Sequence, residues 1–574
     1  MLVAAADHGF IVLFVLLAFL AASVVLGTFA QRSLEKKKFL EGFLLGNRGL
    51  GAWTLALTAT VQSGGTFMGV PSLVYSHGWI VALWISSYMV VPLTGFAMIG
   101  KRVAQLSRRT GALTVPDLFR ERFDDARVGV VASLMIIFFL SFTMFAQFKA
   151  GATIMKLAWP GSGMMSFSED IVEEGPKAEA KKPGLDYKYL VGLTVFAVTV
   201  VGYTMIGGFL ASVWTDLFQS VLMVIGVTIL LFLAVPAAGG LQHATEAAVA
   251  STGPEFAMGP GYNSAGRQFL TPGLAVSMFF LWIYSGFASP ASMIRVMAAH
   301  NTEVIRKSIT LLSVYNCLIY LPIIIIAICG RAIFPALEKP DEIIPTLAMH
   351  LTQGIPGGSL ITALVLTAPF GAIMASVSCF VLVIASGLVQ DLYLRFIHPT
   401  ATEVQIRRAT RLAMMLVGIV GVIAVLNPPM YLQALIVFSG SAGAAAFVTP
   451  AFMACYWRRG TAAGVLAAMI SGFSVLLVLY ATGWIHNWAL AVGDNATGWA
   501  LSIQRALGPD LMIGAATAFR PYFVLGIDPV IWAMLASAVV GISVSFVTRP
   551  PSEEHLQRVY DGPQRLQTAG AISA

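Results

Sequence analysis

Charged residues are scarce in this chain. Only 11% of its 574 residues are Asp, Glu, Lys or Arg, whereas soluble domains usually carry roughly 25%. Hydrophobic residues account for 57% of the chain. This composition excludes an ordinary cytosolic globule, a disordered chain and a nucleic-acid binder, and it predicts a polytopic membrane protein.

Long polar segments are missing as well. The longest are the loops 158–187, 237–271 and 485–526 and the tail after Val547, and each is too short to build a sizeable core. The sequence shows no zinc motif, Walker loop, nucleophile elbow or dinucleotide fingerprint. We therefore expect neither an enzyme nor a resident cofactor, and the pattern favours movement of a solute or ion across a membrane.

Cysteine is rare too. The four cysteines are Cys317, Cys329, Cys379 and Cys455. All lie in apolar stretches and lack the spacing of metal ligands. We expect them to serve as small hydrophobic core residues.

Apolar runs are what the sequence does contain. A helix crosses the hydrocarbon core with about 20 apolar residues. The first run, from about Phe10 to Ala30, ends in a basic segment and not at a small-residue cleavage site, so we expect a retained span. The predicted fold class is all-α, a polytopic membrane protein with about 13 transmembrane helices. The segments lie near 8–30, 50–75, 79–100, 128–157, 188–207, 211–236, 272–298, 309–334, 358–390, 409–426, 429–456, 461–484 and 527–547.

Basic residues indicate the orientation. With the N-terminus outside and the C-terminus inside, most of the 35 Lys and Arg fall in cytoplasmic segments, and Arg295 is counted among them. The external loop 158–187 is rich in acidic residues. We therefore expect a multi-pass protein of the cell (inner) membrane with an outer N-terminus and a cytoplasmic C-terminus.

The second and seventh segments are interrupted. The second contains the run Gln62-Ser-Gly-Gly-Thr66, and the seventh contains Gly286 and Pro290. Proline breaks the helical hydrogen-bond ladder, and irregular backbone within a membrane survives only beside protein or a water-filled cavity. Two interrupted helices at matching positions are typical of an inverted-repeat transporter with a midplane site. An ordinary pair of kinked helices is the alternative.

Three polar residues within the spans are candidates for ion binding. Asp216 lies near the cytoplasmic start of the sixth segment. An ionisable residue in a membrane is costly and therefore suggests a function, although a helix N-cap is the other interpretation. Ser376 and Ser378 in the ninth segment can offer hydroxyl oxygens to a cation or bond back to their own helix.

Several motifs together resemble the sodium/solute symporter family over about residues 10–560. These motifs are Phe43–Arg48, Gly51–Gly69, Gly207–Asp216, Gln390–Tyr393, Tyr456–Thr461 and Thr548–Glu554. Within the family the chain most resembles the sodium/pantothenate symporters. That likeness is carried by Ala112–Phe119, Gly330–Pro335 and Ala368–Met374.

The resemblance implies alternating access by a five-plus-five inverted-repeat core with two broken helices. A single membrane transport domain would occupy 1–574. Its expected parts are a peripheral first span at 8–30, a first repeat at 50–236, a second repeat at 272–456, peripheral spans at 461–547 and a cytoplasmic tail at 548–574.

The resemblance also implies a sodium site between the broken second span and the ninth span. Its ligands would be the backbone carbonyls of Ala59, Gln62 and Ala372 and the hydroxyl of Ser376. The family's other hydroxyl position holds Ala375 in this chain. One oxygen is therefore missing unless water replaces it.

Asp216 and Ser378 match a second sodium position that some family members use. Asp216 also fits a sodium exit path. Sodium would act as the coupling ion, and either one or two sodium ions per solute are compatible with these residues.

Substrate residues implied by the resemblance surround the same breaks. No arginine is placed to clamp a carboxylate, so such a solute would use exposed amides and the positive ends of the broken helices. The predicted substrate-binding residues are Ser63, Gly64, Thr66, Gln147, Trp282, Gly286 and Pro290.

The leading hypothesis is a sodium-coupled secondary active symporter that imports a small organic solute, a carboxylate such as pantothenate. An amino acid, a sugar or another neutral or zwitterionic solute is the alternative. A cation channel would need a continuous polar pore and a membrane sensor an output domain, and the sequence shows neither. The expected partners are sodium, the solute and the lipid bilayer, without nucleic acid; the sequence does not determine the oligomeric state.

Overall fold

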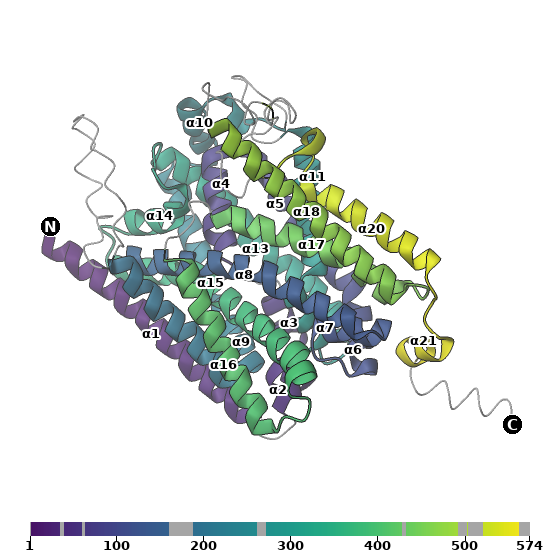
Figure 1. Cartoon of the computed structure of the whole chain (residues 1–574). Helices are drawn as coiled ribbons and strands as arrows, with labels where there is room; N and C mark the ends of the chain where they lie inside the picture. Colours follow the sequence, from purple (N-terminus) through teal and green to yellow (C-terminus); the bar gives the residue numbers. More distant parts are fainter. Residues whose placement is uncertain are drawn as a thin grey trace.

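Helices account for nearly all of the described chain (Figure 1). The computed structural model describes residues 2–34, 39–59, 63–159, 187–260, 271–426, 432–491, 502 and 521–561. The long helices are α1 (Leu2–Leu34), α8 (Ala126–Leu157), α9 (Tyr187–Ala237), α11 (Pro272–Ala288), α13 (Thr302–Ile333), α15 (Gly358–Ser386), α16 (Glu403–Ala424), α17 (Leu432–Tyr456), α18 (Ala462–Ala491) and α20 (Pro529–Val547).

Shorter helices extend or connect the long ones. They are α2 (Phe39–Leu45), α3 (Ala52–Ala59), α4 (Val70–His77), α5 (Ile80–Val91), α6 (Lys101–Thr110), α7 (Val115–Phe123), α10 (Leu241–Thr252), α12 (Pro290–Met297), α14 (Ile343–Leu351) and α21 (Glu553–Tyr560). Three π-helical stretches, η2 (Gly65–Gly69), η3 (Pro92–Gly100) and η6 (Gly387–Ile397), are inserted between them. The predicted all-α class is confirmed.

Ten helical stretches of the described residues are long and apolar enough to cross a membrane. The sequence predicts about 13 spans, and three features explain the difference. The stretch 187–237 counts once but contains two of the predicted spans, and the second span includes residues outside the described part. The tenth span, α16, carries three arginines in its first half, Arg407, Arg408 and Arg411, which leaves too short an uncharged run in the helix.

A glycine turns the chain within α9. Gly208 has φ 56° and ψ −139°, a conformation that residues with a Cβ rarely adopt. A Cβ at this position would also lie 2.6 Å from the ring of Phe43. The turn falls in the predicted gap between the fifth and sixth spans, and it divides the 51 residues of α9 into two helical segments.

The predicted break in the seventh span is present, and the predicted break in the second span falls partly on residues outside the described part. The second span consists of α3 and of η2 continuing into α4, with the residues between 59 and 63 outside the described part. The seventh span is divided at Ser289, whose extended backbone (φ −63°, ψ 118°) separates α11 from α12. Pro290 opens α12, where the absence of its N–H costs no helical hydrogen bond.

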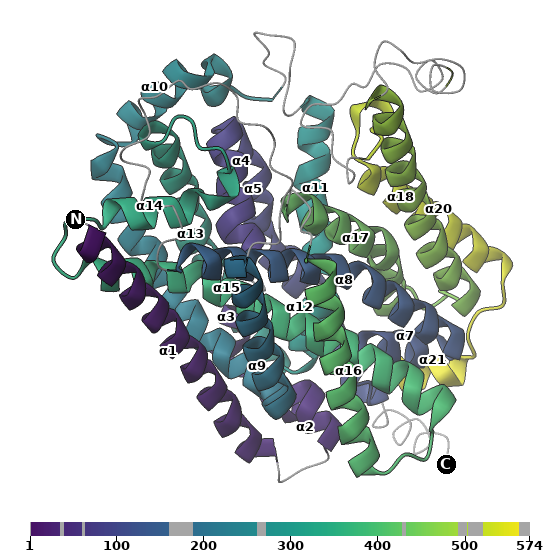
Figure 2. The ribbon, with the colours of Figure 1, turned by 60° about the vertical axis from the view of Figure 1, so that its left-hand side comes forward.

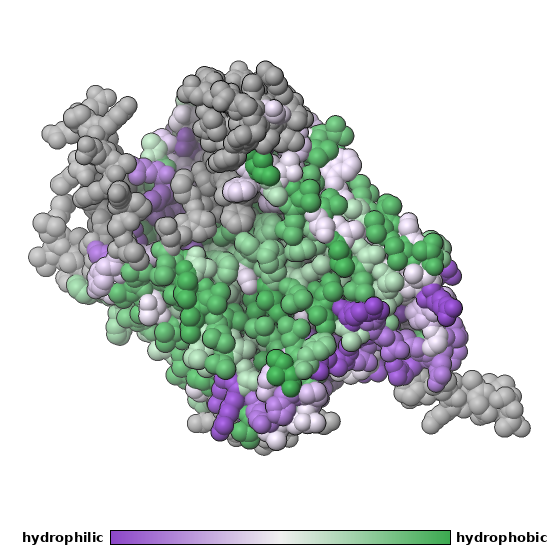
Figure 3. Space-filling view, in the orientation of Figure 1, coloured by the Kyte–Doolittle hydropathy of each residue, from purple (hydrophilic) through white to green (hydrophobic). Residues whose placement is uncertain are grey.

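The helices differ sharply in burial. In the most apolar segment of each long helix, the share of buried residues is 94% for the stretch that includes α15. It is only 33% for α1 and 28% for α20. Figure 2 shows α1 along one edge of the bundle and α18 with α20 along the opposite edge. Figure 3 shows a broad hydrophobic surface across the middle, with hydrophilic residues gathered towards α6, α7 and α21. This surface fits a helical bundle embedded in lipid.

The two broken spans are joined at one end by backbone hydrogen bonds. Leu50, just before α3, donates its N–H to the carbonyl of Ala298 at 3.1 Å, and it accepts from the N–H of His300 at 3.0 Å. Arg48 donates to the carbonyl of Met297 at 3.4 Å. We call this contact the backbone bridge.

Replacing Gly208 by alanine should destabilise the protein. We expect a cost of about 1–3 kcal/mol, since the substitution strains the backbone and drives a Cβ into Phe43. Thermal unfolding of purified protein, followed by gel filtration, measures the shift. Gly202→Ala is the matched control, because a Cβ at Gly202 in the same helix meets nothing within 4 Å. An equal melting temperature for the two variants would contradict this account.

Candidate functional site

The backbone just beyond the first break bonds to its own side chains. The N–H groups of Thr66 and Phe67 donate to the carbonyl of Ser63 at 2.9 and 3.2 Å. The hydroxyl of Ser63 accepts from the N–H of Gly65 at 3.1 Å. The polar residues that loosen the helix therefore also satisfy some of the peptide groups that the break leaves without partners.

Gln147 on α8 supports this backbone from the side. Its Oε1 accepts from the N–H of Gly64 at 2.6 Å, and the side chain is fully buried. Gly64 is tightly enclosed, because a Cβ there would lie 2.8 Å from the Cβ of Ala150. Both residues thus lie behind the break as parts of its scaffold.

A cavity of about 140 Å³ lies between the two broken spans. Five of the seven predicted substrate residues line it: Ser63, Thr66, Trp282, Gly286 and Pro290. Gly64 and Gln147 are not among the lining residues. The described residues that line the cavity carry no charged side chain but many hydroxyl groups, including those of Ser63, Thr66, Thr143, Ser285, Ser289, Ser292 and Ser439.

Aromatic rings cover one side of the cavity. Tyr88 of α5 stacks between Trp282 of α11 and Tyr320 of α13, with ring centroids 4.7 and 5.0 Å apart. The hydroxyl of Tyr320 lies 3.3 Å from the Oγ1 of Thr66. The sequence analysis missed Tyr88 and Tyr320, although a tyrosine in the middle of an apolar span is the signal that would have found them.

At the expected main sodium position, α15 packs against the backbone that follows the first break. A Cβ at Gly64 would lie 3.3 Å from the side chain of Ile373, the neighbour of Ala372. Ser376 is fully buried, and its hydroxyl donates to the carbonyl of Ala372 at 3.1 Å. Ala59 is the last residue of α3, and Gln62 lies outside the described residues.

The second proposed sodium position contains a buried ion pair. Asp216 of α9 accepts a hydrogen bond from the guanidinium of Arg295 of α12, and their side chains are 2% and 1% exposed. Ser212 links Asp216 to Ser378 of α15, at 3.4 Å from the carboxylate and 2.8 Å from the Ser378 hydroxyl. Three helices therefore meet at one buried polar cluster.

The position of Arg295 corrects the orientation argument. The sequence analysis counts this residue with the cytoplasmic segments, but the structure buries it in α12. Its guanidinium also donates to the sulfur of Cys379 at 3.0 Å. Cys379 therefore bonds to a cation as well as filling space, and the expectation of purely hydrophobic core cysteines fails here. Cys317 departs from it too, because it is exposed on the surface of the protein.

The sequence is similar to those of known sodium-coupled transporters. The sequence profile described as "Sodium:solute symporter family" matches residues 43–162 and 181–472. The sodium/pantothenate symporter of Haemophilus influenzae is 28% identical over 463 residues, which cover 79% of this chain and 87% of that protein. The sodium/proline symporter of Escherichia coli is 25% identical over 493 residues, covering 82% and 88%.

A solved structure supports the fold. A substrate-bound, outward-open state of a Na⁺-coupled sialic acid symporter aligns with a TM-score of 0.66. The alignment covers 95% of this chain and all of that one at 17% identity. At this identity the likeness establishes the fold alone.

Breaking the Asp216–Arg295 pair should destabilise the protein strongly. We expect Arg295→Met to cost about 3–5 kcal/mol, because it leaves a buried carboxylate without its cation. Adding Asp216→Asn should recover part of that loss. Equilibrium unfolding by detergent titration in mixed micelles provides the double-mutant cycle.

The matched control is Lys307→Met, which removes a cation from an exposed pair with Glu303. This variant should change stability little, because water screens such pairs. Additive effects of Arg295→Met and Asp216→Asn would show that the two side chains do not stabilise each other.

Proposed function

Because this chain belongs to the sodium:solute symporter family, we propose that it imports a small organic carboxylate, such as pantothenate, together with sodium by alternating access. Membership of the family supports sodium-coupled solute symport in general. The substrate, its direction of movement and the residue roles are our proposal. The observation that carries it is the hydroxyl-lined cavity between two interrupted helices.

The cavity supports a solute with several hydrogen-bonding groups. Serine and threonine hydroxyls both donate and accept, so they can bond to hydroxyl, amide and carboxylate groups of a bound molecule. Ser63, Thr66 and Thr143 line the cavity, and so does Trp282. An amphipathic solute such as pantothenate combines these polar groups with an apolar part that an aromatic ring can cover.

A carboxylate would bind at helix ends. The lining includes Pro290, Ala291 and Ser292, which form the first turn of α12. The N-terminus of a helix presents free N–H groups and a positive partial charge, which together favour an anion. This arrangement supports a carboxylate without an arginine clamp.

A sodium ion would bind beside the cavity, between the first break and α15. We propose the carbonyls of Ala59, Gln62 and Ala372 and the hydroxyl of Ser376 as its ligands. Ser376 is buried and now donates to the Ala372 carbonyl. Rotation of the Ser376 hydroxyl would leave its Oγ and the Ala372 carbonyl oxygen free to bind a cation. A water molecule would supply the ligand that Ala375 lacks.

The buried Arg295 supports a stoichiometry of one sodium ion per solute. Its guanidinium already balances the charge of Asp216, so a second sodium ion would have to displace it. We propose Asp216 and Ser378 as a passage for the departing ion once Arg295 releases the carboxylate. One sodium ion with one monocarboxylate carries no net charge.

One observation favours a second candidate solute. The described lining residues are uncharged, which also suits a zwitterionic or neutral molecule. A sodium/proline symporter is among the relatives of similar coverage. With such a solute, transport of one sodium ion would move a net charge.

We expect the chain to span the cell (inner) membrane with its N-terminus outside and its C-terminus in the cytoplasm. α21 then lies on the cytoplasmic side. Tyr560 of this helix donates to the carbonyl of Ala454 at 2.7 Å and accepts from Arg122 at 2.8 Å. These bonds join the described part of the tail to α7 and α17.

Removing the Ser376 hydroxyl should weaken sodium binding. Ser376→Ala should raise the sodium concentration that gives half-maximal uptake by about tenfold or more, because a buried cation loses a ligand. Uptake by vesicles over a sodium series measures the change. Ser386→Ala, a buried serine of the same helix that bonds to Val383, is the control and should behave as wild type. Unchanged sodium dependence of Ser376→Ala would reject the site.

Uptake into proteoliposomes tests the proposal as a whole. With an inward sodium gradient we expect saturable uptake of labelled pantothenate and little uptake of proline or glucose. A potassium–valinomycin potential should leave the pantothenate rate unchanged, because one sodium ion and one monoanion draw no energy from voltage, whereas a net charge would gain about 2.3 kcal/mol per 100 mV.

Two results would overturn parts of this proposal. Solute uptake at the same rate with and without a sodium gradient would show that transport is not coupled to sodium. Voltage-dependent uptake of proline in place of pantothenate would establish the zwitterionic alternative.

A further inference from the structure

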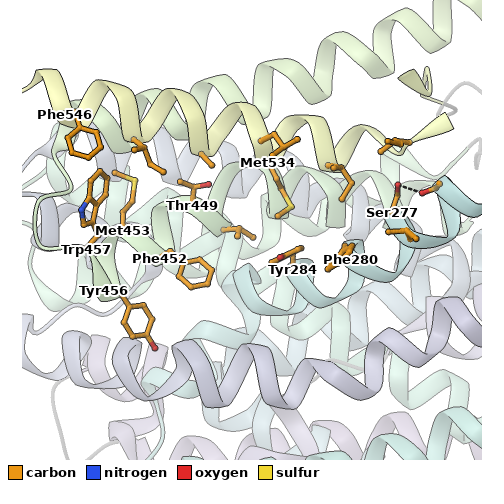
Figure 4. Close-up of a pocket in the computed structure, with 18 of the residues that line it drawn as sticks. Ser277, Phe280, Tyr284, Thr449, Phe452, Met453, Tyr456, Trp457, Met534 and Phe546 are labelled. Carbon is orange, nitrogen blue, oxygen red and sulfur yellow. Dashed lines mark hydrogen bonds between the residues drawn. The ribbon is translucent and has the colours of Figure 1, made fainter. Parts of the chain in front are cut away.

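A larger groove opens on another side of α11. Its volume is about 1120 Å³, and α11, α17 and α20 form its walls (Figure 4). Apolar and aromatic side chains dominate the lining, among them Val276, Phe280, Tyr284, Phe452, Trp457, Met534 and Phe546. We call this feature the lateral groove.

The lateral groove has most of the height of a membrane. Its lining residues on α20 run from Ile531 to Phe546, which at 1.5 Å per residue is about 22 Å, most of the length of this helix. The hydrocarbon core of a bilayer is about 30 Å thick. Val276, Leu535 and Phe546 are more than half exposed, so the groove opens towards the lipid and not into the protein.

Two arginines mark one end of this groove. The guanidinium carbon of Arg102 lies 5.7 Å from the centre of the Tyr456 ring, and that of Arg459 lies 5.4 Å from the Phe546 ring. Both rings line the groove, and both arginines are exposed. This end therefore combines an aromatic belt with positive charge, as at the cytoplasmic surface of a membrane.

Two acidic residues of the described tail pair with a different arginine. The carboxylates of Glu553 and Asp561 pair with Arg458. Arg459 donates to the carbonyl of Phe546 at 3.0 Å, which holds its side chain at the groove. Tyr456 donates its hydroxyl to the carbonyl of Met98, which holds its ring beside Arg102.

We propose that the lateral groove binds an anionic phospholipid of the inner leaflet. The phosphate lies between Arg102 and Arg459, and the acyl chains run between α17 and α20 towards Tyr284. Arginine suits this role because its planar guanidinium forms paired hydrogen bonds with phosphate oxygens. Basic pockets between transmembrane helices on the cytoplasmic side are a known setting for anionic headgroups.

The bound chains would touch a helix that also borders the substrate cavity. Phe280 and Tyr284 line the lateral groove from α11, whereas Trp282 of the same helix lines the substrate cavity. The lipid therefore packs against the back of a helix whose other face borders the proposed solute. The binding site itself does not depend on which solute is transported.

Native mass spectrometry of the full-length protein tests the proposal. The protein is released from vesicles of phosphatidylcholine and phosphatidylglycerol in equal parts, and retained lipids are counted. We expect one preferentially retained phosphatidylglycerol. The double variant Arg102→Gln with Arg459→Gln should bind it about twenty-fivefold more weakly, at roughly fivefold per surface arginine.

The charge-matched control is Arg306→Gln with Arg411→Gln, which removes two exposed arginines from α13 and α16. This control should retain the lipid as wild type does. Equal retention by both double variants, or equal retention of phosphatidylcholine and phosphatidylglycerol by the wild type, would overturn the proposal.

A second variant tests the groove without changing charge. Ala538→Trp places a large side chain among the lining residues of α20. We expect loss of the retained phosphatidylglycerol with both arginines in place. Full retention in this variant would show that the acyl chains do not occupy the groove and would overturn that part of the proposal.

Discussion

Within a bilayer, peptide groups that leave a helix must find partners in the protein or in a cavity, and the site depends on this constraint. At the first break, the Ser63 hydroxyl and the buried amide of Gln147 each accept from a backbone N–H. At the second break, Ser289 is extended and its carbonyl accepts from Met293. These bonds keep two irregular segments stable, so that polar groups can border the cavity.

The same constraint explains why the surrounding helices differ. α15 is almost entirely buried and α8 just over half buried, whereas α1, α18 and α20 present most of their apolar side chains outwards. The buried charges obey an equivalent rule, because Asp216 and Arg295 each supply the counter-ion that the membrane interior lacks. The central helices therefore hold the polar chemistry, and the outer helices face the lipid.

The pattern of apolar runs and helix-breaking residues was enough to predict the main architecture. Pro290 and the Ser63–Gly65 run mark the two breaks, and the gap between the fifth and sixth spans contains Gly208. The residues that line the cavity were harder to predict, because the rotation of each helix decides which side chains face inwards. Tyr88 and Tyr320 both line the cavity and were missed for this reason. Arg295 was misplaced because a basic residue within two turns of a helix end can lie in a loop or point into the core.

The backbone bridge has a mechanical consequence. It connects the segment before α3 with the segment after α12, so the two interrupted spans share a fixed point at one end. Tilting either half-helix by itself would break these bonds, so the bridge couples the positions of α3 and α12.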